Sequence, residues 1–144
     1  MRFRGTHDHN LDAKNRLTVP SKLRVQFADR LVIAKSVDPC LALWSEDAYD
    51  AMVETALAKL NPQSPEKRRM DRFYNAYAQA TEIDAAGRVM IPGFLMEAAE
   101  LGREVVLSGA GDRLEIWDRA FWNTEDAAIT AGIQDLTANL GHAG

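Results

Sequence analysis

The sequence predicts an α+β fold built from two tandem copies of one unit, and two observations support this prediction. The stretch 12–20, Asp-Ala-Lys-Asn-Arg-Leu-Thr-Val-Pro, returns in the second half of the 144-residue chain as 84–92, Asp-Ala-Ala-Gly-Arg-Val-Met-Ile-Pro. A pair of short apolar runs follows each copy, at 31–34 and 41–44, then at 105–108 and 114–117. A duplication of this kind indicates that each copy is one supersecondary unit packing against the other.

Each repeated stretch predicts a turn, a short strand and a proline that ends the strand. The Asp that opens each copy can bond its own backbone, and Asn15 or Gly87 before the Arg tolerates positive φ. The apolar run after the Arg is typical of a strand, and proline cannot donate to a ladder. Helices are expected next, at 22–27 with Ser21 as a possible cap and at 94–99.

The paired apolar runs predict one β-hairpin in each half. Asp38-Pro39 separates the members of the first pair, and the Gly-rich stretch 109–112 separates the second. Each pair ends on a tryptophan that a polar helix start follows. After Trp44, residues 46–60 carry apolar side chains at helical spacing, which predicts an amphipathic helix packed on the sheet.

The middle and the end of the chain add two more expected helices. Residues 61–65 contain two prolines and are expected to separate the two halves. The sequence of residues 66–80 predicts a helix. Its basic cluster 67–69 could contact phosphate, but we favour a solvated face that pairs with neighbouring carboxylates. A helix capped by Thr124 is expected to loosen at its glycines. The expected organisation is a first unit at 1–60, a connecting helix at 61–80, a second unit at 81–130 and a flexible tail at 131–144.

Composition bounds the classes of protein that this chain can represent. Hydrophobic residues make up 47% of the chain, as in ordinary globular proteins, and no run approaches the ~20 apolar residues of a membrane span. The single cysteine, Cys40, excludes an intrachain disulfide. The first residues lack the apolar core of a signal peptide, so a cytoplasmic location is expected.

Charge is distributed unevenly along the chain. Residues 1–35 carry eight basic and three acidic residues, a net charge of +5, so the remainder carries −9 of the total of −4. Such a basic face could bind phosphate while the acidic body avoids non-specific adhesion. An ordinary solvated surface is the alternative, and charge alone leaves it open.

No set of residues predicts catalysis, a cofactor or a metal centre. His7 and His9 share one face of an extended segment, but zinc normally takes three or four protein ligands. Cys40 has no nearby histidine in the sequence, and no serine stands in a nucleophile motif. Phosphate loops and dinucleotide fingerprints are also missing. We therefore expect a protein that is not an enzyme and needs no small-molecule substrate.

Taken together, these features resemble the MraZ family of bacterial regulators. The resemblance rests on Phe3-Arg4-Gly5, on the 12–20 and 84–92 pair, on the Leu-Ala-Leu-Trp strand at 41–44 and on the length, and it covers roughly residues 1–135. It implies two tandem AbrB-like swapped-hairpin units that share one small barrel-like core, with flanking helices. Asn15 departs from the glycine that is common there.

The resemblance also implies a function and a set of residues. Proteins similar to MraZ are non-enzymatic transcription regulators that bind direct repeats upstream of their own division and cell-wall operon, and they typically repress it. They form ring-shaped homo-oligomers, and the expected location is the cytoplasm, in association with the nucleoid. Arg16 matches the family's DNA-binding arginine and Asp12 its partner, while Arg88 and Asp84 match the second copy.

Two further DNA-binding candidates, Lys14 and Arg4, come from charge rather than from the resemblance. The Asp–Arg pairs themselves have two compatible interpretations. They could hold the turn, although a surface pair contributes only ~0–1 kcal/mol, or the Asp could orient the Arg toward a phosphate or a guanine edge. An antitoxin-like protein that binds a partner protein is the alternative function.

Overall fold

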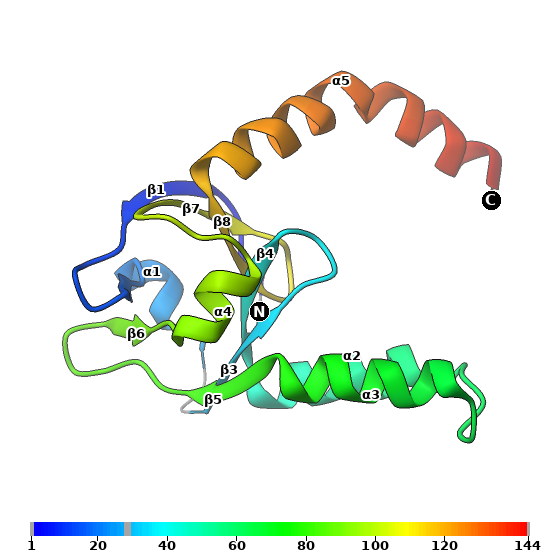
Figure 1. Ribbon diagram of the computed structural model, residues 1–144. Coiled ribbons are helices and arrows are strands. Elements are labelled where there is room, and N and C mark those ends of the chain that lie inside the picture. The colour runs from blue at the N-terminus through cyan, green and yellow to red at the C-terminus, as the bar shows by residue number, and fades with distance from the viewer. Residues whose placement is uncertain (1, 28–29, 144) are drawn as a thin grey trace.

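The computed structural model describes residues 2–27 and 30–143 and contains a mixed α+β fold, as predicted (Figure 1). The first half contains β1 (Thr6–Asn10), β2 (Arg16–Thr18), α1 (Ser21–Arg24), β3 (Leu31–Lys35), β4 (Cys40–Ser45) and α2 (Glu46–Leu57). The second half contains α3 (Pro65–Ala76), β5 (Ala78–Thr81), β6 (Arg88–Met90), α4 (Gly93–Ala98), β7 (Glu104–Gly109), β8 (Leu114–Asp118) and α5 (Arg119–Ala143).

Both sheets contain strands from both halves of the chain. One sheet has the order β1-β7-β8-β4-β3-β5, and β2 pairs with β6 in a separate two-stranded ribbon. Strand β1 of the first half thus pairs with β7 of the second half, and β5 of the second half pairs with β3 of the first. Neither half contains all the strands of either sheet, so the two halves form a single fold.

The two predicted hairpins are confirmed. Strands β3 and β4 pair with Val32 opposite Trp44, and β7 and β8 pair with Val106 opposite Trp117. Strands β4 and β8 then join the hairpins side by side. Nearly every residue of these four strands is buried, which agrees with their continuous apolar sequences.

The core is shared between the halves. Leu17 and Val89, from the two repeated stretches, are both fully buried. They lie in one apolar cluster with Phe3, Leu11, Val19, Leu23, Leu31, Ile33, Leu41, Leu43, Ile91, Leu95, Ala99, Leu101, Val105, Leu107, Leu114 and Ile116. A unit of about 70 residues alone would have a thin core, and here the interleaved strands of both halves surround one cluster.

Helices α2 and α3 lie side by side and extend from the sheet (Figure 1). They cover a second, smaller cluster that includes Val32, Ala42 and Trp44. The hydroxyl of Tyr49 on α2 donates to the carbonyl of Tyr74 on α3 over 2.7 Å. Burial raises the pKa of Tyr49 to about 12, so this hydroxyl keeps its proton at neutral pH.

Several predicted helix boundaries were wrong. Helix α1 spans Ser21–Arg24 rather than 22–27, and Pro20 stands at its N-cap without a side-chain cap bond, so Ser21 is not the cap. Helix α2 ends at Leu57. Helix α3 ends at Ala76, and residues 78–80, expected to be helical, lie in β5. The edge of β3 explains this last difference, because its backbone groups need a partner strand.

The C-terminal segment also differs from the prediction. Helix α5 begins at Arg119, so Thr124 lies inside it, where its hydroxyl donates to the carbonyl of Ala120 over 3.4 Å. Residues 131–143, expected as part of a flexible tail, continue the helix, and residue 144 lies outside the described residues. Figure 1 shows α5 leading away from the sheets. In the described part of the chain, none of the helices is long and apolar enough to cross a membrane.

Candidate functional site

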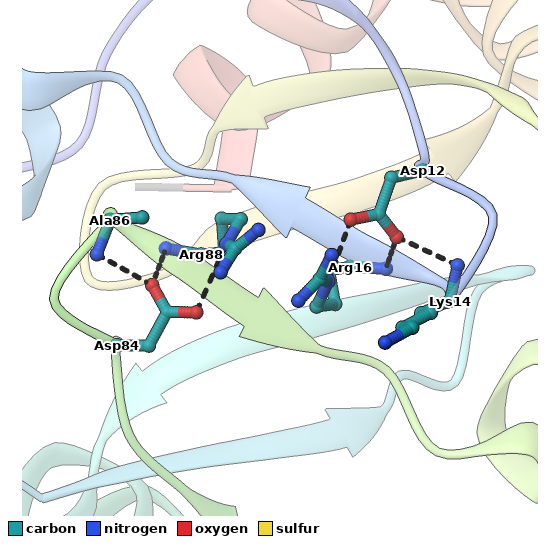
Figure 2. A network of polar contacts seen from close by, with 6 residues as sticks. All are labelled: Asp12, Lys14, Arg16, Asp84, Ala86 and Arg88. Carbon is teal, nitrogen blue, oxygen red and sulfur yellow. Dashed lines mark hydrogen bonds and ion pairs between the residues drawn. The ribbon is translucent and has the colours of Figure 1, made fainter.

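The first repeated turn is held together by one aspartate. Oδ1 of Asp12 accepts hydrogen bonds from the backbone N–H groups of Lys14 and Arg16, each over 2.9 Å. Oδ2 accepts from Nε of Arg16 over 2.6 Å, which makes an ion pair across the turn (Figure 2). The carboxylate therefore fixes both the backbone of the turn and the direction of the arginine.

The second turn repeats this geometry with different residues. Oδ1 of Asp84 accepts from the N–H groups of Ala86 and Arg88 over 2.9 Å each, and Oδ2 accepts from Nε of Arg88 over 3.0 Å. Figure 2 shows the two networks at opposite ends of the β2–β6 ribbon. Two sequences that share only part of their residues thus form the same local structure.

The residue before each arginine has the positive φ that the sequence predicted. Asn15 has φ 58° and Gly87 has φ 82°. Their carbonyls join the two copies, because Asn15 accepts from the N–H of Ile91 and Gly87 accepts from the N–H of Val19, each over 2.9 Å. The left-handed residue of each turn is therefore bonded to the strand of the other copy.

The ribbon directs both arginines to one face. In the β2–β6 register Arg16 lies opposite Met90, and Thr18 lies opposite Arg88. Because side chains alternate along strands, these four residues share the outer face while Leu17 and Val89 point into the core. Diagonal neighbours in such a pair lie ~7–8 Å apart, so the two guanidinium groups can contact one ligand surface together.

Thr18 and Met90 of this outer face were missed at the level of sequence. Thr18 is exposed, and the Met90 side chain is 57% exposed, which is unusual for a large apolar residue in a strand. The alternation with Leu17 and Val89 was the signal that could have found them. A thioether and a methyl group between two arginines give this face apolar as well as cationic contacts.

Hydrogen bonding sets the protonation of both aspartates. The backbone N–H of Arg16 holds the pKa of the Asp12 carboxyl below its usual range, helped by the Arg16 side chain. Arg88 lowers the pKa of Asp84 in the same way. Both carboxylates are therefore ionised at neutral pH. Because each carboxylate takes Nε, the terminal nitrogens of the arginine are left to donate to a ligand.

Of the two DNA-binding candidates chosen for their charge, one lies on the first turn and the other lies apart from it. Lys14 is exposed on the first turn beside Arg16 (Figure 2), whereas the second turn has Ala86 at the same place. Arg4 lies elsewhere. It precedes β1 next to Gly109, where a Cβ would meet the backbone of Arg4, so it stands at the opposite end of β7 from Asp12. Arg4 is therefore separated from Lys14 and Arg16 of the first turn by the length of β7.

The remaining candidates do not form a site. Cys40 is fully buried, and burial raises its pKa to about 12, so its thiol stays protonated. Burial also lowers the pKa of His9, which is only half-buried on β1 beside His7. Among the described residues, no group of three or more His, Cys, Asp or Glu side chains is placed to hold a metal ion.

Comparison with known proteins identifies the family. Residues 2–73 and 75–138 match the family described as "MraZ protein, putative antitoxin-like". The relative from Desulforamulus reducens, "Transcriptional regulator MraZ", is 34% identical over 138 residues, which is 96% of each chain. Relatives of the same name from Desulfitobacterium hafniense and Alkaliphilus oremlandii are 35% and 32% identical, over 96% of this chain and 99% of theirs. Matches of this extent over both halves confirm the resemblance, and the chain belongs to the MraZ family.

Proposed function

We propose that this protein is a sequence-specific DNA-binding transcriptional regulator that contacts duplex DNA through the outer face of the β2–β6 ribbon. The observation that carries the proposal is the pair of arginines, Arg16 and Arg88, each bonded through Nε to an aspartate and both on one face. Lys14 adds a cation to the first turn. The names of the relatives, all transcriptional regulators, support the same assignment.

Shape and charge both suit DNA. The major groove of B-DNA is ~12 Å wide and admits a two-stranded β-ribbon. A guanidinium whose Nε is already bonded still offers its terminal N–H groups to phosphate oxygens or to a guanine edge. Because the aspartate holds the side chain in place beforehand, less conformational entropy is lost on binding.

The family resemblance supplies the finer parts of the proposal. We infer that the target is a set of direct repeats upstream of the protein's own division and cell-wall operon and that binding represses it. The protein would then act in the cytoplasm in association with the nucleoid, without catalysis or a cofactor. The exchange of β1 and β5 between the halves supports tandem AbrB-like swapped-hairpin units as the fold.

Self-association into a ring belongs to the same proposal. Helix α5 carries a stripe of exposed apolar residues at alternating spacings of four and three, Ile129, Ile133, Leu136 and Leu140, as at a helix–helix contact. A ring would present several ribbons to repeated sites and raise avidity by ~10²–10⁴. Arg4, at the opposite end of β7 from the first turn, is proposed to contact a flanking phosphate.

The test is a gel-shift titration on the protein's own upstream DNA at two salt concentrations. Wild type, Arg16→Ala and the control Lys59→Ala are compared, because Lys59 is exposed beyond the end of α2, away from the ribbon. We expect tight, salt-sensitive binding by wild type and control and its loss in Arg16→Ala. A folded wild type that does not bind at low salt would contradict the proposal.

An antitoxin-like protein that binds a partner protein is the second candidate, and the family's own description favours keeping it. A measured mass in solution separates the two. A ring of many subunits supports the regulator, whereas a dimer that fails to bind the upstream DNA supports the antitoxin-like function.

A further inference from the structure

Arg24 of the first half lies against the turn of the second half. A Cβ built on Gly87 would meet Nη1 and Cζ of Arg24, so the guanidinium covers this glycine. Arg24 is the last residue of α1, directly after the buried Leu23, and its side chain is only half-buried. The shared core therefore fixes a third cation beside the ribbon, from a segment with no Asp-x-x-x-Arg pattern.

The position of Arg24 matches a difference in charge between the two turns. The first turn carries Lys14 and Arg16, whereas the second has Ala86 in place of the lysine. With Arg24 in contact with Gly87, the second turn also has two cations, Arg88 and Arg24. The same position in the second copy is Met96, partly buried against the core, so the first turn receives no such arginine.

The positive charge of Arg24 is not paired with a carboxylate among the described residues. Its Nε is buried and has no hydrogen-bond partner among the described residues, and none of the ion pairs of the described chain includes this side chain. A guanidinium without a carboxylate partner attracts an anion more strongly than one already in an ion pair, and its terminal nitrogens are the atoms that can donate to a phosphate. Asp12 and Asp84 are already bonded to their own turns.

We propose that Arg24 and Arg88 together form a second phosphate-binding site on the DNA-facing surface, with Arg24 acting across the two halves in place of the missing lysine. This inference rests on the proposed function. It makes the two turns of one chain equivalent in charge although their sequences differ. Each chain then neutralises two phosphates near each turn.

A purely structural role is the competing explanation, since Arg24 could do no more than cover Gly87. The two roles separate through salt dependence. For duplex DNA, log K falls with log [salt] by ~0.9 for each phosphate neutralised, so a lost contact lowers the slope by about one for each bound chain. If Arg24 only covers Gly87, its replacement lowers the free energy of unfolding and leaves the dependence of log K on log [salt] unchanged.

The experiment compares wild type, Arg24→Met, Arg24→Lys, Arg16→Ala and the control Lys59→Met by binding titration on the upstream DNA over a series of salt concentrations. Methionine is the residue that the second copy uses at this position, so Arg24→Met keeps apolar cover and removes the charge. Lysine keeps the charge and removes the planar fork. Thermal unfolding of each variant checks that the fold is intact.

We expect Arg24→Met to bind about tenfold more weakly at low salt with a slope reduced by about one per bound chain, and Arg24→Lys to keep the wild-type slope. An Arg24→Met variant with wild-type affinity and slope, while Arg16→Ala has lost binding, overturns the inference and leaves the proposed function standing. A wild type that binds no DNA overturns both.

Discussion

Among the single residues, Asp12 and Asp84 have the same role in both turns. Each accepts two backbone N–H bonds and one arginine Nε. A short carboxylate at the first position is therefore needed for two separate reasons, the conformation of the turn and the direction of the arginine. The loss of either function has a measurable consequence.

Replacement of Asp12 by asparagine should weaken DNA binding and destabilise the fold in a pH-dependent way. The folded-state pKa of Asp12 lies below its unfolded value, so its stabilisation is complete above the unfolded pKa of ~3.9 and is lost as pH falls through the folded value. The difference in Tm between wild type and Asp12→Asn should therefore stay constant above about pH 5 and narrow below about pH 4. A difference that widens on acidification would contradict this account.

The two left-handed residues should respond differently to substitution. Gly87→Ala places a Cβ at φ 82° and against Arg24, so it should cost ~1 kcal/mol or more of unfolding free energy. Asn15→Gly, the matched change in the first turn, removes a side chain that already tolerates φ 58° and should change stability by less than ~0.5 kcal/mol. Urea unfolding of both variants tests this, and equal losses of unfolding free energy would contradict the strain expected at position 87.

At the scale of secondary structure, the β2–β6 ribbon converts a sequence repeat into a surface. Antiparallel pairing brings the start of one strand beside the end of the other, so residues 16 and 88 meet diagonally on one face. A parallel arrangement of the same two stretches would have placed the two turns at one end. The antiparallel direction thus places the two turns at opposite ends of the ribbon while the arginines remain diagonal neighbours on one face.

A negative charge introduced on this face should abolish DNA binding without loss of the fold. Met90 is 57% exposed, so Met90→Glu should change the free energy of unfolding by no more than ~0.5 kcal/mol. The new carboxylate would repel phosphate and compete for both arginines. Thr55→Glu adds the same charge on the exposed surface of α2 and serves as the control in a binding titration. Binding retained by Met90→Glu would move the interface away from the ribbon.

In the complete chain, the two halves depend on each other. Strand β1 has its partner in β7 and β5 has its partner in β3, and the core draws on both halves. We expect a fragment of residues 1–63 to show no cooperative thermal unfolding by circular dichroism. Mixing it with a fragment of residues 64–144 should restore cooperative unfolding. Cooperative unfolding of the isolated first fragment would show that the halves are independent domains.

The exposed stripe of α5 should control the size of the assembly. The double variant Ile133→Glu with Leu136→Glu places charges on a surface that we propose is buried between subunits, where unpaired charges are costly. Light scattering after size exclusion should report a smaller particle, and affinity for repeated sites should fall by ~10² or more as avidity is lost.

The matched control for the α5 stripe is the double variant Gln134→Glu with Ala138→Glu. Both residues are exposed, and helical periodicity places them on the side of α5 that faces away from the stripe. This variant should keep the wild-type mass and affinity. An unchanged mass in the stripe variant would place the subunit contacts elsewhere.

Much of this structure follows from local chemistry that is visible in the chain. The Asp and the Arg of each turn lie within five residues of one another, so the hydrogen bonds that the carboxylate accepts need no distant partner. The hairpins are similarly local, since short turns join paired apolar runs. For this reason the turns, the hairpins and the pairing of Asp12 with Arg16 and of Asp84 with Arg88 were predictable from the amino-acid sequence alone.

Other features depend on contacts between residues far apart in sequence. Residues 78–80 have a helical pattern but form β5, because the edge of β3 lies next to them and needs hydrogen bonds. The exposed residues Thr18 and Met90 lie beside the two arginines only because β2 pairs with β6. Arg24 reaches Gly87 only because α1 of one half packs beside the turn of the other. Local hydrogen bonding therefore specifies each turn, whereas the burial of a shared core decides which side chains from the two halves meet around it.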